Sequence, residues 1–118
     1  MKSILKPKSF AFAVRVVNLY KHLCEVKREY VISKQLLRSG TAIGALVREA
    51  EQAESKADFV HKMSIALKEA NETEYWLELL KETKYLDTRG FNSMHPDLIE
   101  LLRLLTSIVK TTKKKSTS

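Results

Sequence analysis

The chain has 118 residues, of which 44% are hydrophobic and 30% are charged, and its formal net charge is +7. This length fits a single domain, and the single cysteine, Cys24, excludes an internal disulfide framework and is typical of the reducing cytoplasm. No secretory signal is recognisable and no apolar run reaches the roughly 18 residues of a membrane span, so we expect a cytoplasmic protein rather than a membrane protein.

The first helix is predicted over residues 9–26, with Ser9 as its N-cap. Apolar side chains recur along it at steps of three and four residues, which is the spacing of one buried helix face. These positions are Ala13, Val16, Val17, Tyr20, Leu23 and Cys24. The charged residues that follow predict a short connection.

A second helix is predicted over residues 33–54, and it contains two of the three glycines, Gly40 and Gly44. Its apolar stripe passes through both glycines without a change of phase, which favours a helix over a phosphate-binding loop, and neither common glycine motif for phosphate is present. Because each interior glycine costs a helix about 1 kcal/mol relative to alanine, we expect the close approach of another helix to offset this cost. The expected seam of small residues, a helix-packing or oligomer contact, comprises Gly40, Thr41, Gly44 and Ala45.

A third helix is predicted from the cap residue Ser55 to about Asp87, with Gly90 beyond it as a stop signal. It carries two apolar stripes. The first comprises Phe59, Met63, Ala66, Ala70, Leu77 and Leu80, and the second comprises Ile65, Trp76, Leu79 and Leu86. One stripe suffices for packing in a small bundle, so the second predicts either an unusually enclosed helix or a surface that another subunit buries.

A fourth helix is predicted from near Pro96 to about Lys110, since proline is tolerated in the first turn of a helix. Residues 111–118 are rich in lysine, serine and threonine and predict a disordered basic tail. Four amphipathic helices with short connections are typical of an all-α, antiparallel up-down four-helix bundle. We therefore expect a bundle over residues 1–110 and a tail over residues 111–118.

No arrangement of residues predicts catalysis, a metal site or a cofactor. Among His22, His61 and His95, only His61 has a carboxylate at the spacing of di-iron bundles, and that residue, Asp58, is better explained as part of a helix cap. Cys24 has apolar neighbours, which favours a small buried side chain over a nucleophile. We expect a protein that is not an enzyme, with no catalytic residue, no metal ligand and no cofactor.

Two stretches of the sequence resemble a known family. Residues 37–50, LRSGTAIGALVREA, resemble the signature of the ribosomal-RNA intervening-sequence proteins, also called the four-helix-bundle protein family. Residues 55–59, SKADF, and 65–77, IALKEANETEYWL, resemble the third helix of that family. The resemblance covers about residues 9–110 and implies a four-helix bundle that assembles into a homo-pentamer and has no assigned activity. Members are encoded within intervening sequences of large-subunit ribosomal RNA genes. A more distant similarity is to the accessory variability determinant of diversity-generating retroelements, a basic pentamer that binds a reverse transcriptase and nucleic acid.

Charge is spread unevenly along the chain. Residues 1–48 carry ten basic and two acidic side chains, residues 49–100 carry six and twelve, and residues 101–118 carry five and none. This asymmetry indicates attraction to nucleic acid, to an acidic protein or between copies of the chain. A solvated surface with a basic tail would carry the same charges.

Two functions compete on this basis. In the first, an oligomer presents basic helices to RNA or DNA, and the phosphate contacts are Lys6, Lys8, Arg15, Lys34, Arg38 and Arg48. In the second, the protein is an interaction scaffold or accessory subunit whose positive charge faces an acidic protein partner, without nucleic-acid binding.

Overall fold

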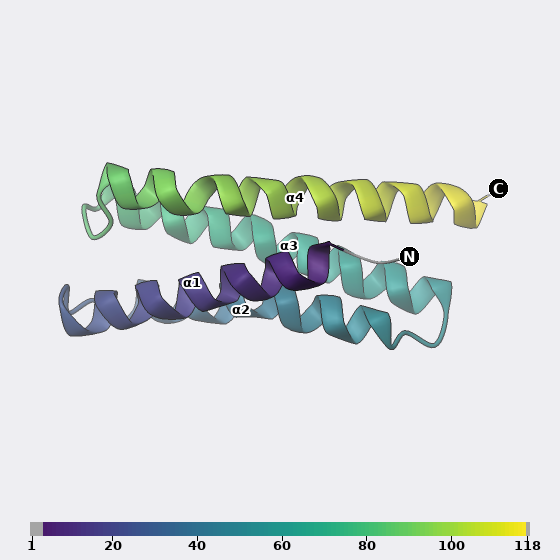
Figure 1. The fold of residues 1–118 in the computed structure, drawn as a ribbon, viewed down its shortest axis with the longest axis horizontal. Helices are drawn as coiled ribbons and strands as arrows, with labels where there is room; N and C mark the ends of the chain where they lie inside the picture. The colour runs from purple at the N-terminus through teal and green to yellow at the C-terminus, as the bar shows by residue number, and fades with distance from the viewer. Residues whose placement is uncertain (1–3, 118) are drawn as a thin grey trace.

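The structure, a computed structural model, describes residues 4–117 and consists there of four helices: α1 (Leu5–Glu25), α2 (Ile32–Glu51), α3 (Lys56–Glu82) and α4 (Thr88–Thr117). The helices lie alongside one another in an elongated bundle of 50 × 21 × 21 Å, and the chain turns back at each connection (Figure 1). The prediction of an all-α four-helix bundle is confirmed. Within residues 4–117, none of the helices combines the length and the apolar character needed to cross a membrane.

One apolar stripe from each helix builds the core of the bundle. Side chains three or four positions apart share a helix face, so each stripe can turn inward, where burial of a large apolar side chain contributes about 1.5–3 kcal/mol. The largest fully buried side chains are Phe12, Leu5, Leu23, Leu36, Ile43, Leu77, Leu80, Leu98, Leu101, Leu105, Val16 and Val47. α2 packs against α1 and α3, α3 packs against α4, and a sparser contact between α1 and α4 closes the ring.

The two glycines of α2 lie against α1 of the same chain. A Cβ atom at Gly40 would lie 2.8 and 2.9 Å from the two γ-carbons of Val16, which is closer than side chains pack. A Cβ atom at Gly44 would lie 3.4 Å from the backbone oxygen of Ser9, which is an ordinary contact. The two helices are therefore closer at Gly40 than any larger residue there would permit.

α1 begins earlier than predicted. It begins at Leu5, and Ser9 is buried inside the helix, where its hydroxyl donates a hydrogen bond to the carbonyl oxygen of Lys6 (3.1 Å). Pro7 does not interrupt this start, because the first N–H groups of a helix have no partner within it. The prediction that Ser9 is the N-cap is wrong. Ser9 lies inside α1, where its hydroxyl bonds to the backbone of its own helix and its atoms pack against Gly44 of α2.

The boundary between α3 and α4 also differs from the prediction. α3 ends where Lys84 adopts a left-handed backbone conformation (φ 68°), which commonly terminates a helix. α4 begins directly after Asp87, whose carboxylate accepts a hydrogen bond from the N–H of Gly90 (2.7 Å) in the manner of an N-cap. Gly90 is therefore in the first turn of α4 and is not a stop signal, and Pro96 lies inside this helix rather than at its start.

The start of α3 agrees with the prediction, and the end of α4 extends beyond it. Ser55 caps α3 as predicted, because its hydroxyl accepts a hydrogen bond from the N–H of Asp58 (3.0 Å). α4 is described to Thr117, past the expected end at Lys110, and Ser118 lies outside the described residues. The division of the chain into a bundle and a disordered tail stays a prediction.

The start of α2 is capped by a buried carboxylate. Glu29 accepts hydrogen bonds from the backbone N–H groups of Val31 (3.1 Å), Ile32 (2.9 Å) and Ser33 (2.6 Å), and the hydroxyl of Ser33 donates to the carbonyl oxygen of Glu29 (2.7 Å). Burial raises the pKa of the Glu29 carboxyl, but these backbone hydrogen bonds to the charged form outweigh burial and leave the pKa below its ordinary value.

Replacing Glu29 by glutamine should therefore destabilise the protein in a pH-dependent way. A carboxyl whose pKa is lowered by folding stabilises the protein above its unfolded pKa, and that contribution is lost as the pH falls through its folded pKa. We expect the free energy of unfolding of Glu29→Gln to be about 0.5–2 kcal/mol lower at pH 7, with a smaller deficit at pH 3, as measured by urea denaturation. Glu25→Gln, at an exposed position, serves as the control, and an equal deficit for Glu29→Gln at both pH values would contradict the proposed capping.

The two glycines should respond differently to alanine. Gly40→Ala would force its methyl group against Val16, and overpacking of this kind costs about 1–3 kcal/mol, more than the helix propensity of alanine returns. Gly44→Ala has room and should be neutral or stabilise the protein by up to about 1 kcal/mol. Thermal or urea unfolding measures both effects, and adding Val16→Ala should rescue Gly40→Ala in part. Equal stability of the two alanine variants would show that the close contact at Gly40 is absent.

Candidate nucleic-acid interface

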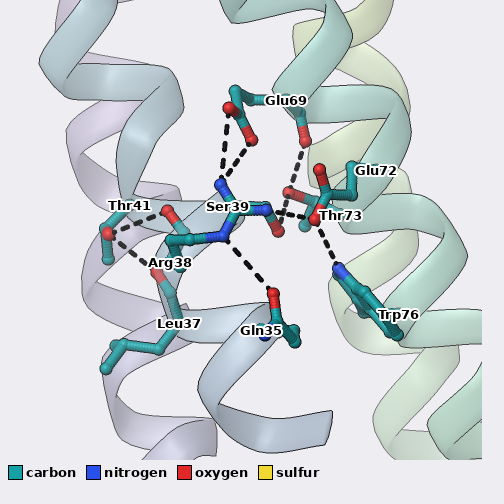
Figure 2. A network of polar contacts seen from close by, with 9 residues as sticks. All are labelled: Gln35, Leu37, Arg38, Ser39, Thr41, Glu69, Glu72, Thr73 and Trp76. Carbon is teal, nitrogen blue, oxygen red and sulfur yellow. Dashed lines mark hydrogen bonds and ion pairs between the residues drawn. The ribbon is translucent and has the colours of Figure 1, made fainter.

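Arg38 of α2 is the centre of a polar cluster between α2 and α3 (Figure 2). Its Nη1 atom donates to a carboxylate oxygen of Glu69 (3.2 Å), and its Nη2 atom donates to the carboxylate of Glu72. Glu72 also accepts a hydrogen bond from the indole N–H of Trp76 (2.9 Å). The charge of Arg38, one of the six predicted phosphate contacts, is thus already balanced by two carboxylates.

These hydrogen bonds favour the charged forms of Glu72 and Arg38. The hydrogen bonds from Trp76 and Arg38 lower the pKa of the Glu72 carboxyl, and the hydrogen bond to Glu72 raises the pKa of the Arg38 guanidinium. A phosphate would therefore have to displace a carboxylate to bind Arg38. Removal of Arg38 would also leave Glu69 and Glu72 without their shared cation, so a substitution there tests the fold as well as binding.

Arg15 of α1 is bound to α4 around Pro96. Its Nη1 atom donates to the carbonyl oxygen of Ser93 (2.9 Å) and to the carboxylate of Asp97 (2.7 Å), and its Nη2 atom donates to the hydroxyl of Ser93 (2.5 Å). Proline has no N–H to donate to the carbonyl oxygen of Asn92 in the turn before it, and Arg15 binds the next residue of that turn, Ser93. Arg15 therefore joins α1 to α4.

Lys6 and Lys8, at the start of α1, are paired with carboxylates from other helices. The Nζ atom of Lys6 lies 3.3 Å from the carboxylate of Glu51 on α2, and that of Lys8 lies 3.1 Å from the carboxylate of Glu100 on α4. All four side chains are exposed, so these pairs are weak and screened by salt. They still reduce the positive potential of α1.

The last two predicted phosphate contacts, Lys34 and Arg48, are exposed on α2. The guanidinium of Arg48 lies 5.2 Å from the centre of the Phe10 ring, whereas Lys34 lies near the opposite end of the helix. The structure therefore does not bring the six predicted residues together on one surface. Five of them lie at the boundaries of α1 with α2, α1 with α4 and α2 with α3, four of these pair with carboxylates, and Lys34 is exposed near the start of α2.

A different basic surface lies between α3 and α4. We call it the basic groove: a depression of about 630 Å³ lined by Leu67, Asn71, Ile99, Leu102, Arg103, Thr106, Ser107 and Lys110. Within the part of the chain that the structure describes, no acidic side chain lines it. Arg103 and Lys110 supply two cations, and the hydroxyl and amide side chains supply uncharged donors.

The basic groove is absent from the sequence prediction, although one signal pointed to it. Residues 101–118 carry five basic side chains and no acidic one. Three of these five basic residues fall in the predicted tail and two, Arg103 and Lys110, in the predicted fourth helix, but the sequence does not show that these two line one depression with Asn71 of another helix. The groove exists only once α3 and α4 are packed.

The predicted seam of small residues lies at the boundary of α1 and α2. Gly40 is buried, whereas Thr41, Gly44 and Ala45 line a shallow depression of about 320 Å³ beside Phe10. The Thr41 hydroxyl donates back to the carbonyl oxygen of Leu37 (2.7 Å), within α2. The seam is thus a contact within the chain whose outer edge reaches the surface.

The predicted second stripe of α3 is divided between core and surface. Ile65, Trp76 and Leu79 are half-buried, whereas Leu86 lies after the end of α3 and is buried by its own chain. Trp76 meets the exposed ring of Tyr75 edge-on, with ring centres 4.9 Å apart. Leu86 is therefore a core residue and offers no surface to another subunit, because the chain turns back before it.

Comparisons with known proteins agree with this architecture. The model of the family described as 23S rRNA-intervening sequence protein matches residues 1–107. A crystal structure of a protein with unknown function from the S23 ribosomal protein family of Bacteroides thetaiotaomicron VPI-5482 is 59% identical, with a TM-score of 0.89, and the match covers 91% of this chain and 99% of that chain. The comparison with curated proteins finds no match, and the more distant similarity to the accessory variability determinant stays a prediction. The family resemblance is confirmed, and the chain belongs to the 23S rRNA-intervening sequence protein family.

Proposed function

We propose that this protein is a non-enzymatic homo-oligomer that binds the sugar-phosphate backbone of RNA or DNA in the basic groove. The observation that carries the proposal is the lining of the groove, where Arg103 and Lys110 lie beside hydroxyl and amide donors and, within the described residues, no carboxylate takes part. Phosphate oxygens accept hydrogen bonds from side chains of these kinds. The same lining offers no carboxylate or imidazole that could act as a general base, which supports a binding role over a catalytic one.

The groove has a shape that suits an extended strand. Arg103 and Lys110 lie seven positions apart, which places them on one helix face about 10 Å apart along the axis. Lys113 and Lys114, one turn further on, are exposed on the same helix. A strand that followed α4 would therefore meet several cations in succession.

Binding of this kind depends on charge and not on base sequence. The lining presents cations and short polar side chains, and we expect little discrimination between sequences because nothing in it resembles an element that reads base edges. The family description, which refers to 23S rRNA, supports a structured RNA as the first probe. Oligomerisation would repeat the groove and convert a modest attraction for each subunit into avidity.

An apolar surface on α1 supports self-association. Phe10 and Val14 lie one turn apart and remain 55% and 45% exposed, next to the depression that Thr41 and Ala45 line. Exposed apolar surface of this kind is typical of a protein contact. The partner that we propose for it is a second copy of the chain, and five is the number of subunits that the family resemblance implies.

Self-association can be tested on purified protein. We expect light scattering at micromolar concentration to give a multiple of the 13.5 kDa chain mass. Phe10→Ser combined with Val14→Ser should dissociate the oligomer while circular dichroism stays helical, because both side chains are exposed. Val26→Ser, at a more exposed apolar position in the connection between α1 and α2, should leave the assembly unchanged. A parent protein that is monomeric at this concentration would contradict the proposed self-association.

Nucleic-acid binding is best tested by salt titration. We expect the affinity for an RNA hairpin, measured by filter binding, to fall steeply between about 50 and 200 mM salt, since each neutralised phosphate adds about 0.7–0.9 to the logarithmic slope. Arg103→Glu with Lys110→Glu should weaken binding and reduce the slope by about two. A duplex DNA of the same length measures any preference for RNA.

The matched control has the same change of charge elsewhere. Lys21→Glu with Arg89→Glu alters two exposed positions outside the basic groove and should retain most of the binding. Equal losses in the two double variants would show that overall charge, and not the groove, governs binding. Absence of any salt-dependent binding by the parent protein would favour the alternative, a scaffold or accessory subunit for an acidic protein.

A further inference from the structure

Three metal-ligating side chains meet on α3 and α4, closer than the basic groove to the end where these helices are connected. Glu74 and Glu78 lie one turn apart on α3, and His95 lies on α4. One ligand atom from each can be chosen so that all three lie within 4.8 Å of one another. The Nε2 atom of His95 is already 2.8 Å from a carboxylate oxygen of Glu74.

The surroundings of His95 hold its ring in place. The ring stacks on the buried side chain of Phe91, with centres 4.7 Å apart and planes 20° apart. The side chains of His95 and Glu74 are each 27% exposed, while Glu78 lies on the exposed side of the cluster. Two of the ligands are therefore partly ordered by packing, and the third is free to move toward them.

We propose that Glu74, Glu78 and His95 bind a divalent transition-metal ion, with Zn²⁺ the ion that this ligand set fits. Zn²⁺ takes imidazole nitrogen and carboxylate oxygen at about 2.0–2.2 Å, so neighbouring ligand atoms in a tetrahedral site are about 3.4 Å apart. The ligand atoms here lie within 4.8 Å of one another, so Glu78 has to move closer, which rotation of its exposed side chain allows, while the hydrogen-bonded atoms of His95 and Glu74, 2.8 Å apart, have to separate slightly to admit the ion. The imidazole ligand disfavours Mg²⁺ and Ca²⁺, which prefer oxygen alone.

Nearby charge also suits a cation. Glu78, Glu82 and His95 line one depression of about 480 Å³ on the outer side of the cluster, together with Lys81. The ammonium group of Lys81 lies 4.7 Å from the centre of the Phe91 ring, and its positive charge opposes the binding of a metal ion. The carboxylates of Glu74, Glu78 and Glu82 outnumber this single positive charge. The depression leaves room for water as the fourth ligand of the metal.

The sequence analysis predicted no metal site, and it missed this ligand set for a geometric reason. Sequence reveals ligand pairs only at short spacings on one helix, and His61 is the histidine with such a partner, Asp58. The cluster instead joins a glutamate pair on α3 to a histidine on α4, and only the reversal of the chain between these helices brings them together. The inference is independent of nucleic-acid binding, because none of the three ligands lines the basic groove.

Isothermal titration of the untagged protein with ZnCl₂ tests the proposal. We expect saturable binding of one Zn²⁺ per chain, and an affinity at least about tenfold weaker in His95→Ala and in Glu78→Gln. Glu78→Gln changes an exposed side chain, so the fold should be kept even if His95→Ala were to disturb the packing on Phe91. Co²⁺ is a second probe, because its visible absorption should show a four-coordinate ion with a nitrogen ligand in the parent protein and not in His95→Ala.

Two control variants distinguish this site from surface binding in general. His61→Ala and Glu54→Gln each remove an exposed group elsewhere and should bind Zn²⁺ as the parent protein does. If Glu78→Gln bound Zn²⁺ as tightly as these controls, or if the parent protein showed no saturable binding, the proposal would be overturned.

Discussion

A hydrogen bond between two buried hydroxyls sets how α2 and α3 lie against each other. Ser39 and Thr73 are both fully buried, and their oxygen atoms lie 2.9 Å apart (Figure 2). Sliding one helix along the other by a turn, about 5.4 Å, would leave the buried hydroxyl of Ser39 without this partner, at a cost of about 1–3 kcal/mol, whereas Thr73 would keep its hydrogen bond to the carbonyl oxygen of Glu69. Apolar contacts alone tolerate such shifts more readily, so this polar pair selects one register. In that register, Arg38 of α2 lies opposite Glu69 and Glu72 of α3.

The same packing determines which positive charges of the protein are paired with carboxylates and which face the solvent. The basic first half of the chain meets carboxylates from the acidic second half at three helix boundaries, through Lys6, Arg15 and Arg38 among others. These contacts join the helices and leave less charge for a partner. The second half of α4 has no acidic residue of its own after Glu100, and the part of α3 beside it contributes Leu67 and Asn71. Net charge therefore gives a misleading picture of the positive surface, because pairing between helices removes much of the charge where it is densest.

The boundary between α3 and α4 carries two kinds of side chains at different positions along the helix axes. Beside the middle of α3 it carries cations and hydroxyls, and toward the end of α3 it carries carboxylates and a histidine. Both surfaces lie on long helices of a packed bundle. A phosphate and a metal ion could thus be accommodated on one pair of helices without competing for side chains. The boundary of α1 and α2 is different, since its glycine contact brings the helices close and leaves a shallow apolar depression at the surface.

The sequence alone determined the class of fold and several local features. Helix periodicity, the cap at Ser55 and the interpretation of Gly40 as a close helix contact depend on residues that are neighbours along the chain, so they can be read without knowing the packing. Helix ends were less predictable, because the conformation of Lys84 and the cap at Asp87 depend on the geometry of a turn and not on the usual glycine.

Only the tertiary structure decided which charges are paired and which side chains form a site. Arg38 and Glu72 are distant in sequence, as are Arg103 and Asn71, or Glu78 and His95, and each pair meets because two helices pack in one register. Composition records how many charges a chain carries. The distances between helices decide whether those charges neutralise one another or face a ligand.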